Sequence, residues 1–292
     1  MDIQDLSSAP RPTTLSTDVS YEEYAAIPAL RSGVMKDGLL QDADGYVISP
    51  RHIQASYRGT IDKEGESLMF GKALHCLMFE PEVFERDFCY FDGRRDARTK
   101  AYQDFLQENG SKTILKKSGS MSYDWCLWAA EAFCECPVIK PFTEKGAAEV
   151  TGQAVIEDVP VKARFDWISA SRECIVDLKT SQSVGPRDFW GSWKRYGYGV
   201  QMALYREVYK LITGNTLPVY IIALENHPPF VAVVYEVPVD LLDRDAMLVY
   251  RVCETVRGCL ETGEWPSFAG QDIVPLCVPD WEMEASVIDW DS

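Results

Sequence analysis

The sequence predicts an α/β protein in which a central mixed β-sheet is flanked by helices. Three consecutive segments alternate apolar and polar residues and are separated by short polar turns, which is typical of antiparallel strands. Two helical segments and two more strand-like segments follow, so a helical crossover is expected to continue the sheet. The predicted strands cover residues 148–156, 161–168, 173–179, 219–224 and 231–237, and the helices between them cover residues 187–194 and 198–212.

Further helices are expected before and after this region. Apolar residues recur at helical spacing ahead of the first strand and again behind the last one, where Asp240 is placed to cap the final helix. Residues 21–60 are expected to form only short helical pieces, because glycines and prolines interrupt this segment repeatedly. The longer helices are predicted over residues 66–78, 99–108, 118–133 and 240–261.

Length and composition describe an ordinary globular chain. The 292 residues are 46% apolar and 25% charged, a composition that excludes a disordered protein. No apolar run approaches the roughly 18 residues of a membrane span, so no membrane partner is expected. The first residues are polar and acidic and lack the basic flank and apolar stretch of a secretion signal, so we expect a cytoplasmic protein.

The chain is expected to form a single domain over residues 21–270, between two acidic tails. Residues 1–20 are rich in Ser, Thr and Pro and are expected to be a flexible N-terminal tail. Residues 271–292 carry six acidic and no basic side chains and are expected to form the second tail.

The net charge of −16 by itself argues against a nucleic-acid partner, because binding to phosphates requires Lys and Arg. The distribution of charge changes this conclusion. Residues 92–117 contain seven basic and four acidic side chains, and residues 187–210 contain five basic and two acidic ones. Both stretches are compatible with contact to a phosphate backbone, although solvated helix faces explain either one equally well.

The cysteines indicate no disulfide framework and no zinc knuckle. There are nine of them, an odd number, and no two have the spacing CxxC. We therefore expect mostly buried, reduced thiols.

The residues with the clearest chemistry lie in the second and third predicted strands. Asp166 lies near the end of one strand, and Asp177 and Lys179 lie two apart on the next, so the latter two point to the same face. The turn between the strands can bring Asp166 opposite Asp177. Two carboxylates are suitable ligands for Mg²⁺, and a neighbouring ammonium can orient water for attack on a phosphodiester. A plain surface ion pair is the alternative for so short a motif.

Other polar residues can join this group. Gln201 and Tyr205 are four apart on a predicted helix and lie on one face, with Tyr198 one turn earlier. His75 lies within a predicted apolar helix, where a structural core histidine is the alternative to a metal ligand. Glu149 lies near the start of the first predicted strand, where it faces either the same patch or solvent.

Taken in order, these motifs resemble the PD-(D/E)XK nuclease superfamily and, within it, the RecE-type exonucleases (exonuclease VIII C-terminal domain) of phages and prophages. The resemblance covers roughly residues 46–281, and its specificity comes from the order of the set rather than from any single motif. Its residues are Gly71 to His75, Glu80 to Phe84, Arg94, Arg95, Thr99, Lys100, Ala163 to Trp167, Asp177 to Thr180, Tyr198, Gln201, Tyr205, Trp265 and Pro266.

The resemblance implies a restriction-endonuclease-like core and a metal-dependent 5′–3′ exodeoxyribonuclease. Such an enzyme degrades linear double-stranded DNA from its ends and leaves single strands for a RecT-type annealing protein in phage-type recombination. It would use Mg²⁺ or Mn²⁺, form a homo-oligomeric ring, and act in the cytoplasm of the bacterial host of a phage or prophage.

The resemblance also implies roles for particular residues. Gln201 and Tyr205 match the Gln-x-x-x-Tyr element of the related RecB-type nucleases, and Lys179 matches the catalytic lysine. The implied metal ligands are His75, Asp166, Asp177 and, in less distinctive surroundings, Glu149. The implied catalytic residues are Asp166, Asp177, Lys179, Gln201 and Tyr205.

Two alternatives keep part of this interpretation. A Cas4-like or structure-specific nuclease would use the same core, but Cas4-type proteins carry four cysteines for an iron–sulfur cluster, and Cys253, Cys259 and Cys277 are scattered here. A non-catalytic module that binds DNA ends or a protein would use Asp177 and Lys179 only as an ion pair.

Overall fold

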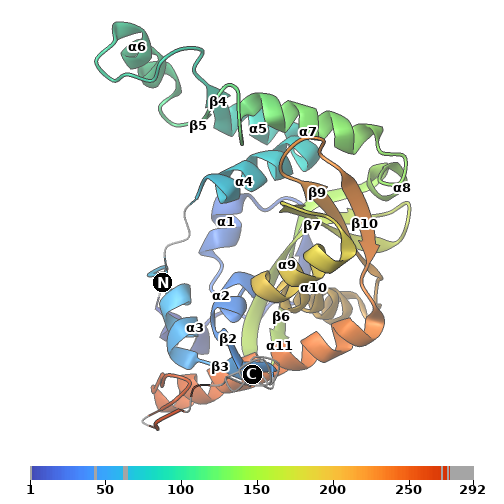
Figure 1. Ribbon diagram of the computed structural model, residues 1–292. Coiled ribbons are helices and arrows are strands. Elements are labelled where there is room, and N and C mark those ends of the chain that lie inside the picture. The colour runs from blue at the N-terminus through green and yellow to red at the C-terminus, as the bar shows by residue number, and fades with distance from the viewer. Residues whose placement is uncertain (1, 43–44, 62–64, 271, 275, 277–292) are drawn as a thin grey trace, which may run out of the picture.

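A six-stranded β-sheet forms the centre of the protein (Figure 1). The computed structural model describes residues 2–42, 45–61, 65–270, 272–274 and 276. The strand order is β1-β6-β7-β8-β9-β10, and every neighbouring pair is antiparallel except β8 and β9. The expected α/β class with a mixed sheet is therefore confirmed. The strands are β1 (Thr14–Ser16), β6 (Gly146–Ile156), β7 (Val159–Ser169), β8 (Cys174–Ser181), β9 (Val219–Glu225) and β10 (Ala232–Glu236).

Helices cover both faces of the sheet (Figure 1). The central strand β9 shows why: Val219, Ile221 and Ala223 face one core, and Ile222 and Leu224 face the other. A strand buried on both faces must be apolar throughout, as this one is. One face is covered by α9 (Pro186–Tyr196), α10 (Tyr198–Thr213) and α11 (Val239–Thr262), and the other by α4 (Glu66–Phe79), α5 (Pro81–Asp87), α7 (Tyr123–Glu135) and α8 (Lys140–Thr143).

The predicted helical crossover is present. Helices α9 and α10 connect β8 to β9, and parallel neighbours require such a connection. Gly197 joins the two helices with a φ of 60°, in the left-handed region that glycine adopts at little cost. Pro238, rather than the expected Asp240, is the residue that precedes α11, and Asp240 lies in its first turn.

The N-terminal quarter of the chain differs from the expectation in two respects. Within residues 2–20, where a flexible tail was expected, Ile3 and Leu6 are fully buried in the main core, and β1 pairs with β6 at the edge of the sheet. A β-hairpin also forms where only short helical pieces were expected. The elements are η1 (Ile3–Ser7), α1 (Tyr21–Ala26), α2 (Ser32–Asp37), β2 (Leu39–Asp42), β3 (Gly45–Ile48) and α3 (Pro50–Tyr57).

The physical reason for the first difference is that the apolar residues of the N-terminal segment are few but correctly spaced. Ile3 and Leu6 are three apart, so a single 3-10 turn presents both to the core. The acidic tail predicted over 271–292 lies almost entirely outside the described residues, and the limits of the single domain at 21 and 270 stay a prediction.

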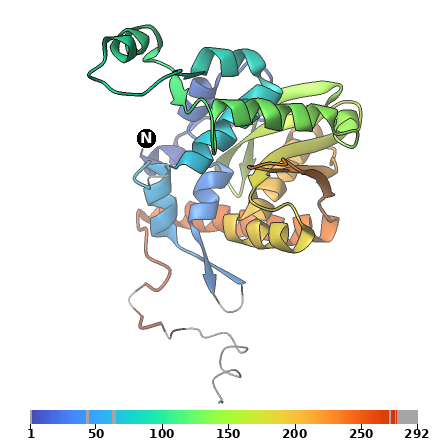
Figure 2. The same ribbon diagram turned by 45° about the horizontal axis from the view of Figure 1, so that its top comes forward.

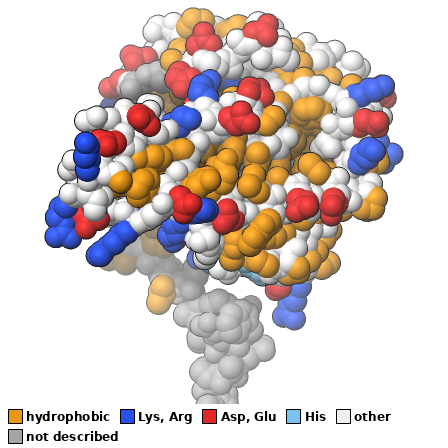
Figure 3. All heavy atoms as spheres, turned by 90° about the horizontal axis from the view of Figure 1, so that it is seen from above, with side chains coloured by type: hydrophobic (Ala, Val, Ile, Leu, Met, Phe, Trp, Pro, Cys, Tyr) orange, Lys and Arg blue, Asp and Glu red, His pale blue; other side chains and the backbone are white. Residues whose placement is uncertain are grey.

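An arm projects from the helical layer that contains α7 (Figures 1 and 2). It carries α6 (Lys100–Asn109), which has no buried residue, and it is rooted in a short parallel pair of β4 (Phe88–Tyr90) and β5 (Thr113–Leu115). Figure 3 views the molecule from above the orientation of Figure 1. In this view basic side chains gather at the margin that the arm forms, and apolar side chains gather over α7. Exposed apolar residues of α7 include Leu127 and Trp128.

Within the described residues, no helix is both long and apolar enough to cross a membrane.

Replacement of Leu6 by alanine is predicted to lower the free energy of unfolding by about 2–5 kcal/mol, because it leaves a cavity in the main core. Leu15 in the same segment is 38% exposed, so Leu15→Ala is the matched control and should cost less than about 1 kcal/mol. Urea unfolding followed by circular dichroism measures both. Equal losses for the two variants would show that the N-terminal segment is not packed on the core.

Candidate active site

The site lies where two neighbouring strands separate. Strands β7 and β8 pair only from Trp167–Ser169 to Cys174–Val176, and β8 then continues beside β9 alone. Beyond Val176 the backbone N–H of Leu178 donates a hydrogen bond to the Asp166 carboxylate at 2.9 Å. The acceptor from β7 is therefore a side chain instead of a backbone carbonyl. Asp166 and Asp177 are the next residues of the two strands beyond the last pair, Trp167 and Val176, so they lie near each other, as the sequence predicted. The gap between the strands therefore receives two carboxylates.

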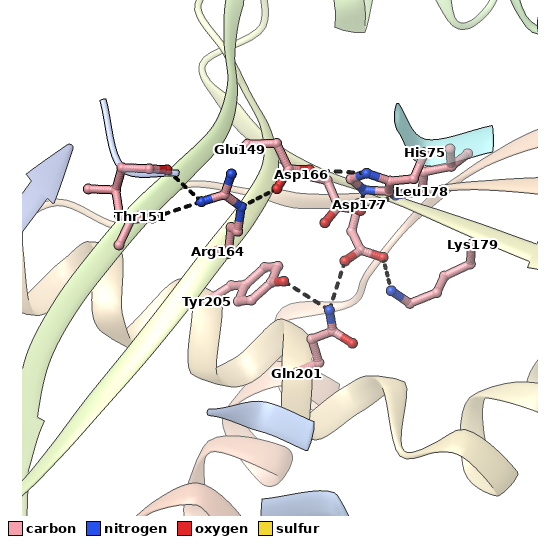
Figure 4. Close-up of polar contacts among 11 residues, drawn as sticks. His75, Glu149, Thr151, Arg164, Asp166, Asp177, Leu178, Lys179, Gln201 and Tyr205 are labelled. Atoms are coloured by element: carbon pink, nitrogen blue, oxygen red, sulfur yellow. Dashed lines mark hydrogen bonds and ion pairs between the residues drawn. The ribbon is translucent and has the colours of Figure 1, made fainter. Parts of the chain in front are cut away.

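The first half of the site joins α4 to β6 and β7 (Figure 4). The two ring nitrogens of His75 contact Glu149 Oε1 at 3.0 Å and Asp166 Oδ2 at 2.8 Å. Glu149 lies opposite Asp166, since Ala148 pairs with Trp167 and Val150 with Phe165. Glu149 also has a φ of 50°, a left-handed conformation that costs free energy for a residue with a Cβ atom. The strained residue of β6 is thus the one whose carboxylate reaches His75.

The second half joins β8 to α10. Lys179 Nζ lies 2.5 Å from Asp177 Oδ2, and Gln201 Nε2 donates hydrogen bonds to Asp177 Oδ1 at 3.2 Å and to the Tyr205 hydroxyl at 2.9 Å. Lys36 Nζ donates to Gln201 Oε1 at 3.2 Å, which fixes the orientation of the amide. All seven residues singled out from the sequence therefore lie in one site, although their roles stay predictions.

Charges inside the site shift the pKa values of its members. Burial and the neighbouring Asp166 raise the pKa of Asp177 to about 7, against the opposing effect of Lys179. Burial would also raise the pKa of Asp166, but the charges of His75 and Lys179 outweigh it and the pKa is lowered. For His75 burial favours the neutral ring, but Asp166 and Glu149 outweigh it and raise the pKa well above the usual value. A carboxylate at each ring nitrogen therefore favours the doubly protonated form of the imidazole.

Two neighbours of the site were not anticipated. Arg164, two residues before Asp166 on the same face of β7, pairs with the Glu149 carboxylate and donates to the backbone carbonyl of Val19 at 2.8 Å. The strand periodicity already placed Arg164 beside Asp166, so this signal was available. Lys36 lies on α2, far from the site in sequence, and its contact with Gln201 had no sequence signal.

The arrangement fits a divalent cation. One ligand atom from each of His75, Glu149 and Asp166 lies within 4.8 Å of the others, and nitrogen and oxygen atoms of this kind suit Mn²⁺ and related ions. Asp177 Oδ2 is buried and faces the Lys179 ammonium, so Asp177 lies beside this group with a cation already paired to it. Ligation by His75 requires loss of one ring proton.

Comparison with known proteins places the chain in a family. Residues 39–272 match the family described as a PDDEXK-like domain of unknown function (DUF3799), and the chain belongs to this family. The structure is similar to the crystal structure of a candidate exonuclease from Eubacterium rectale, with a TM-score of 0.61 and 15% identity over 94% of this chain and 100% of that one. This likeness shows the fold, and the expected restriction-endonuclease-like core is confirmed.

Other comparisons add little. A solved structure named SSO0001 matches 66% of this chain and 87% of its own at 14% identity, and its TM-score of 0.29 is too low to support a statement about fold. The search of curated proteins gives no match.

The Asp166→Asn variant is predicted to bind Mn²⁺ about ten-fold or more weakly than the wild-type protein, because it removes the charge of a carboxylate oxygen from the proposed ligand set. Isothermal titration calorimetry measures the affinity. Asp240→Asn, which removes an exposed carboxylate from the first turn of α11, is the control for the loss of one charge. Equal Mn²⁺ affinities for Asp166→Asn and Asp240→Asn would remove Asp166 from the ligand set.

Proposed function

We propose that this protein is a metal-dependent exodeoxyribonuclease that hydrolyses the phosphodiester bonds of linear double-stranded DNA. The observation that carries the proposal is the group at the gap between β7 and β8, in which three neighbouring strands supply Glu149, Asp166 and Asp177 and in which Lys179 contacts Asp177. Membership in the PDDEXK-like family supports a nuclease, and the similar fold of a candidate exonuclease supports action at DNA ends.

Each residue of the site has a proposed task. His75, Glu149 and Asp166 would hold the cation, with Asp177 beside them. When bound, the cation supplies Lewis acidity to the scissile phosphate and lowers the pKa of a water molecule. The Lys179 ammonium, which Asp177 holds at 2.5 Å, is placed to orient the attacking water and to stabilise charge that develops on the phosphate.

Gln201 and Tyr205 act as positioning residues in this proposal. Both amide hydrogens of Gln201 are used, one by Asp177 and one by Tyr205, so the amide cannot turn without losing two hydrogen bonds. Gln201 therefore holds the Asp177 carboxylate in the orientation that faces Lys179.

The remaining parts of the proposal rest on the resemblance to RecE-type exonucleases. They are 5′–3′ polarity, preparation of single strands for a RecT-type annealing protein, a ring-shaped homo-oligomer, Mg²⁺ as the physiological ion, and a phage or prophage origin in a bacterial cytoplasm. The Cas4-like alternative gains no support from the described residues, since their one candidate metal group contains no cysteine, and Cys253 and Cys259 are buried thiols.

The first prediction of this function concerns DNA ends. With Mg²⁺ or Mn²⁺ the wild-type protein should degrade an end-labelled linear duplex, release the 5′ label first, and leave a closed circle of the same sequence intact. A chelator should stop the reaction. Denaturing gel electrophoresis measures the products. Cutting of the circle would favour a structure-specific or endonucleolytic function, and cutting of neither substrate would favour the non-catalytic binding module.

The role of Lys179 is tested in the same assay with Lys179→Met, which removes the ammonium and keeps most of the side-chain volume. Its rate should fall about a hundred-fold or more if Lys179 acts on the attacking water. Its urea unfolding midpoint shows whether the fold persists. A folded Lys179→Met protein with the wild-type rate would contradict the assigned role.

A further inference from the structure

Aromatic and basic side chains alternate on an exposed surface beside the site. Arg187, Trp190 and Lys194 are spaced three and four apart on α9 and share its outer face. Arg195 and Tyr196 follow at the end of the helix and are also exposed. These five residues are called the α9 surface below.

A continuous series of contacts connects the α9 surface to Lys179. Lys179 Nζ lies 5.3 Å from the centre of the Tyr198 ring, and the Tyr198 ring stacks on that of Tyr196 at 5.7 Å between centroids. The Tyr196 ring therefore lies within about 11 Å of Lys179 Nζ, a distance covered by about three stacked nucleotides of one DNA strand. The left-handed Gly197 makes the sharp corner that brings the two tyrosines together.

The cations of the α9 surface contact aromatic rings rather than acids. The Arg195 guanidinium lies 5.7 Å from the Tyr196 ring, and Lys194 Nζ lies 5.9 Å from the Trp190 ring. Arg187, Lys194 and Arg195 form no ion pair with any described carboxylate, in a protein whose net charge is −16. The one acidic residue of α9, Asp188, accepts a hydrogen bond from Ser183 instead. The positive charge of this surface is thus available to an external anion.

We propose that the α9 surface binds an unpaired strand of DNA next to the scissile phosphate, with one base stacked on Tyr196 and the adjoining phosphates at Arg195 and Lys194. Exposed aromatic rings interleaved with cations are the usual means of binding single strands without regard to sequence. The proposal rests on the nuclease function above, since chemistry at Lys179 is what gives a strand reason to pass this surface.

The chemistry of stacking selects an unpaired nucleotide over a duplex. A base within a duplex is stacked on both faces by its neighbours, whereas an unpaired base has a free face for a tyrosine ring. Tyr196 is 51% exposed, so the part of its ring that Tyr198 and Arg195 leave uncovered is open to such a base, and the buried Tyr198 supports the ring.

The test is binding in EDTA, where no cleavage occurs, of a fluorescein-labelled twelve-nucleotide oligo(dT) measured by anisotropy. Tyr196→Ala should weaken binding about five-fold or more, since stacking of one base contributes at least about 1 kcal/mol. Tyr196→Phe keeps the ring and should bind as the wild type does. Trp128→Ala is the matched control, because Trp128 is 52% exposed but belongs to α7 on the opposite side of the sheet.

Salt dependence tests the phosphate contact separately. Arg195→Ala should reduce the slope of the logarithm of affinity against the logarithm of salt concentration by about 0.7, the value for one contact with a single strand, and Arg195→Lys should restore it. Binding of a blunt hairpin duplex should be the same for Tyr196→Ala and the wild type.

The outcomes separate this proposal from the proposed function. Equal affinities of Tyr196→Ala and Trp128→Ala for the oligonucleotide, or no binding by the wild type, would overturn the α9 proposal even if the wild type degrades linear DNA. A selective loss of single-strand binding in Tyr196→Ala would support it even if the wild type cleaves no DNA, in which case the nuclease function fails alone.

Discussion

The mutual repulsion of three carboxylates in the gap between β7 and β8 is the constraint on which the rest of the site depends. Glu149, Asp166 and Asp177 come from three adjacent strands, and each has a cation beside it: Arg164, His75 and Lys179 respectively. A buried charge without a partner costs several kcal/mol, so these pairings are conditions for folding as well as for chemistry. His75 of α4 contacts Glu149 and Asp166, and the amide of Gln201 on α10 contacts Asp177, so the two helical layers meet at these carboxylates.

Most of the sheet and its crossover could be predicted because each element has its own periodicity and its own turn residues. Apolar residues alternate or recur at helical spacing within the segments that form β6 to β10 and α9 to α11. Tertiary contacts do not override the secondary structure that these patterns predict. The N-terminal segment could not be predicted in this way. Burial of Ile3 and Leu6 depends on a core assembled from distant strands, and the pairing of β1 with β6 joins residues far apart in sequence. Contacts between residues so far apart cannot be predicted from a local sequence pattern.

The same distinction applies to the site. Asp166, Asp177 and Lys179 could be placed together from strand periodicity and one short turn, and Gln201 and Tyr205 from helical spacing. The sequence pattern left His75 and Glu149 as open candidates, and their assignment as ligands required a family resemblance. His75 lies on a helix distant in sequence, and Glu149 has a left-handed backbone that strand periodicity does not predict. Arg164 was overlooked although it is two residues from Asp166, and Lys36 could be found only in three dimensions. The exposed cations of α9 also show that the net charge of the chain does not describe each part of its surface.

The central claim is that the gap between β7 and β8 is a metal-dependent catalytic centre. A crystal structure of the wild-type protein grown with Mn²⁺, with anomalous differences collected for manganese, tests it most directly. An anomalous peak is expected within bonding distance of side-chain atoms of His75, Glu149 and Asp166. A manganese peak found only elsewhere, or no peak at these residues while the ion pairs of His75 remain intact, would contradict a metal centre in this gap.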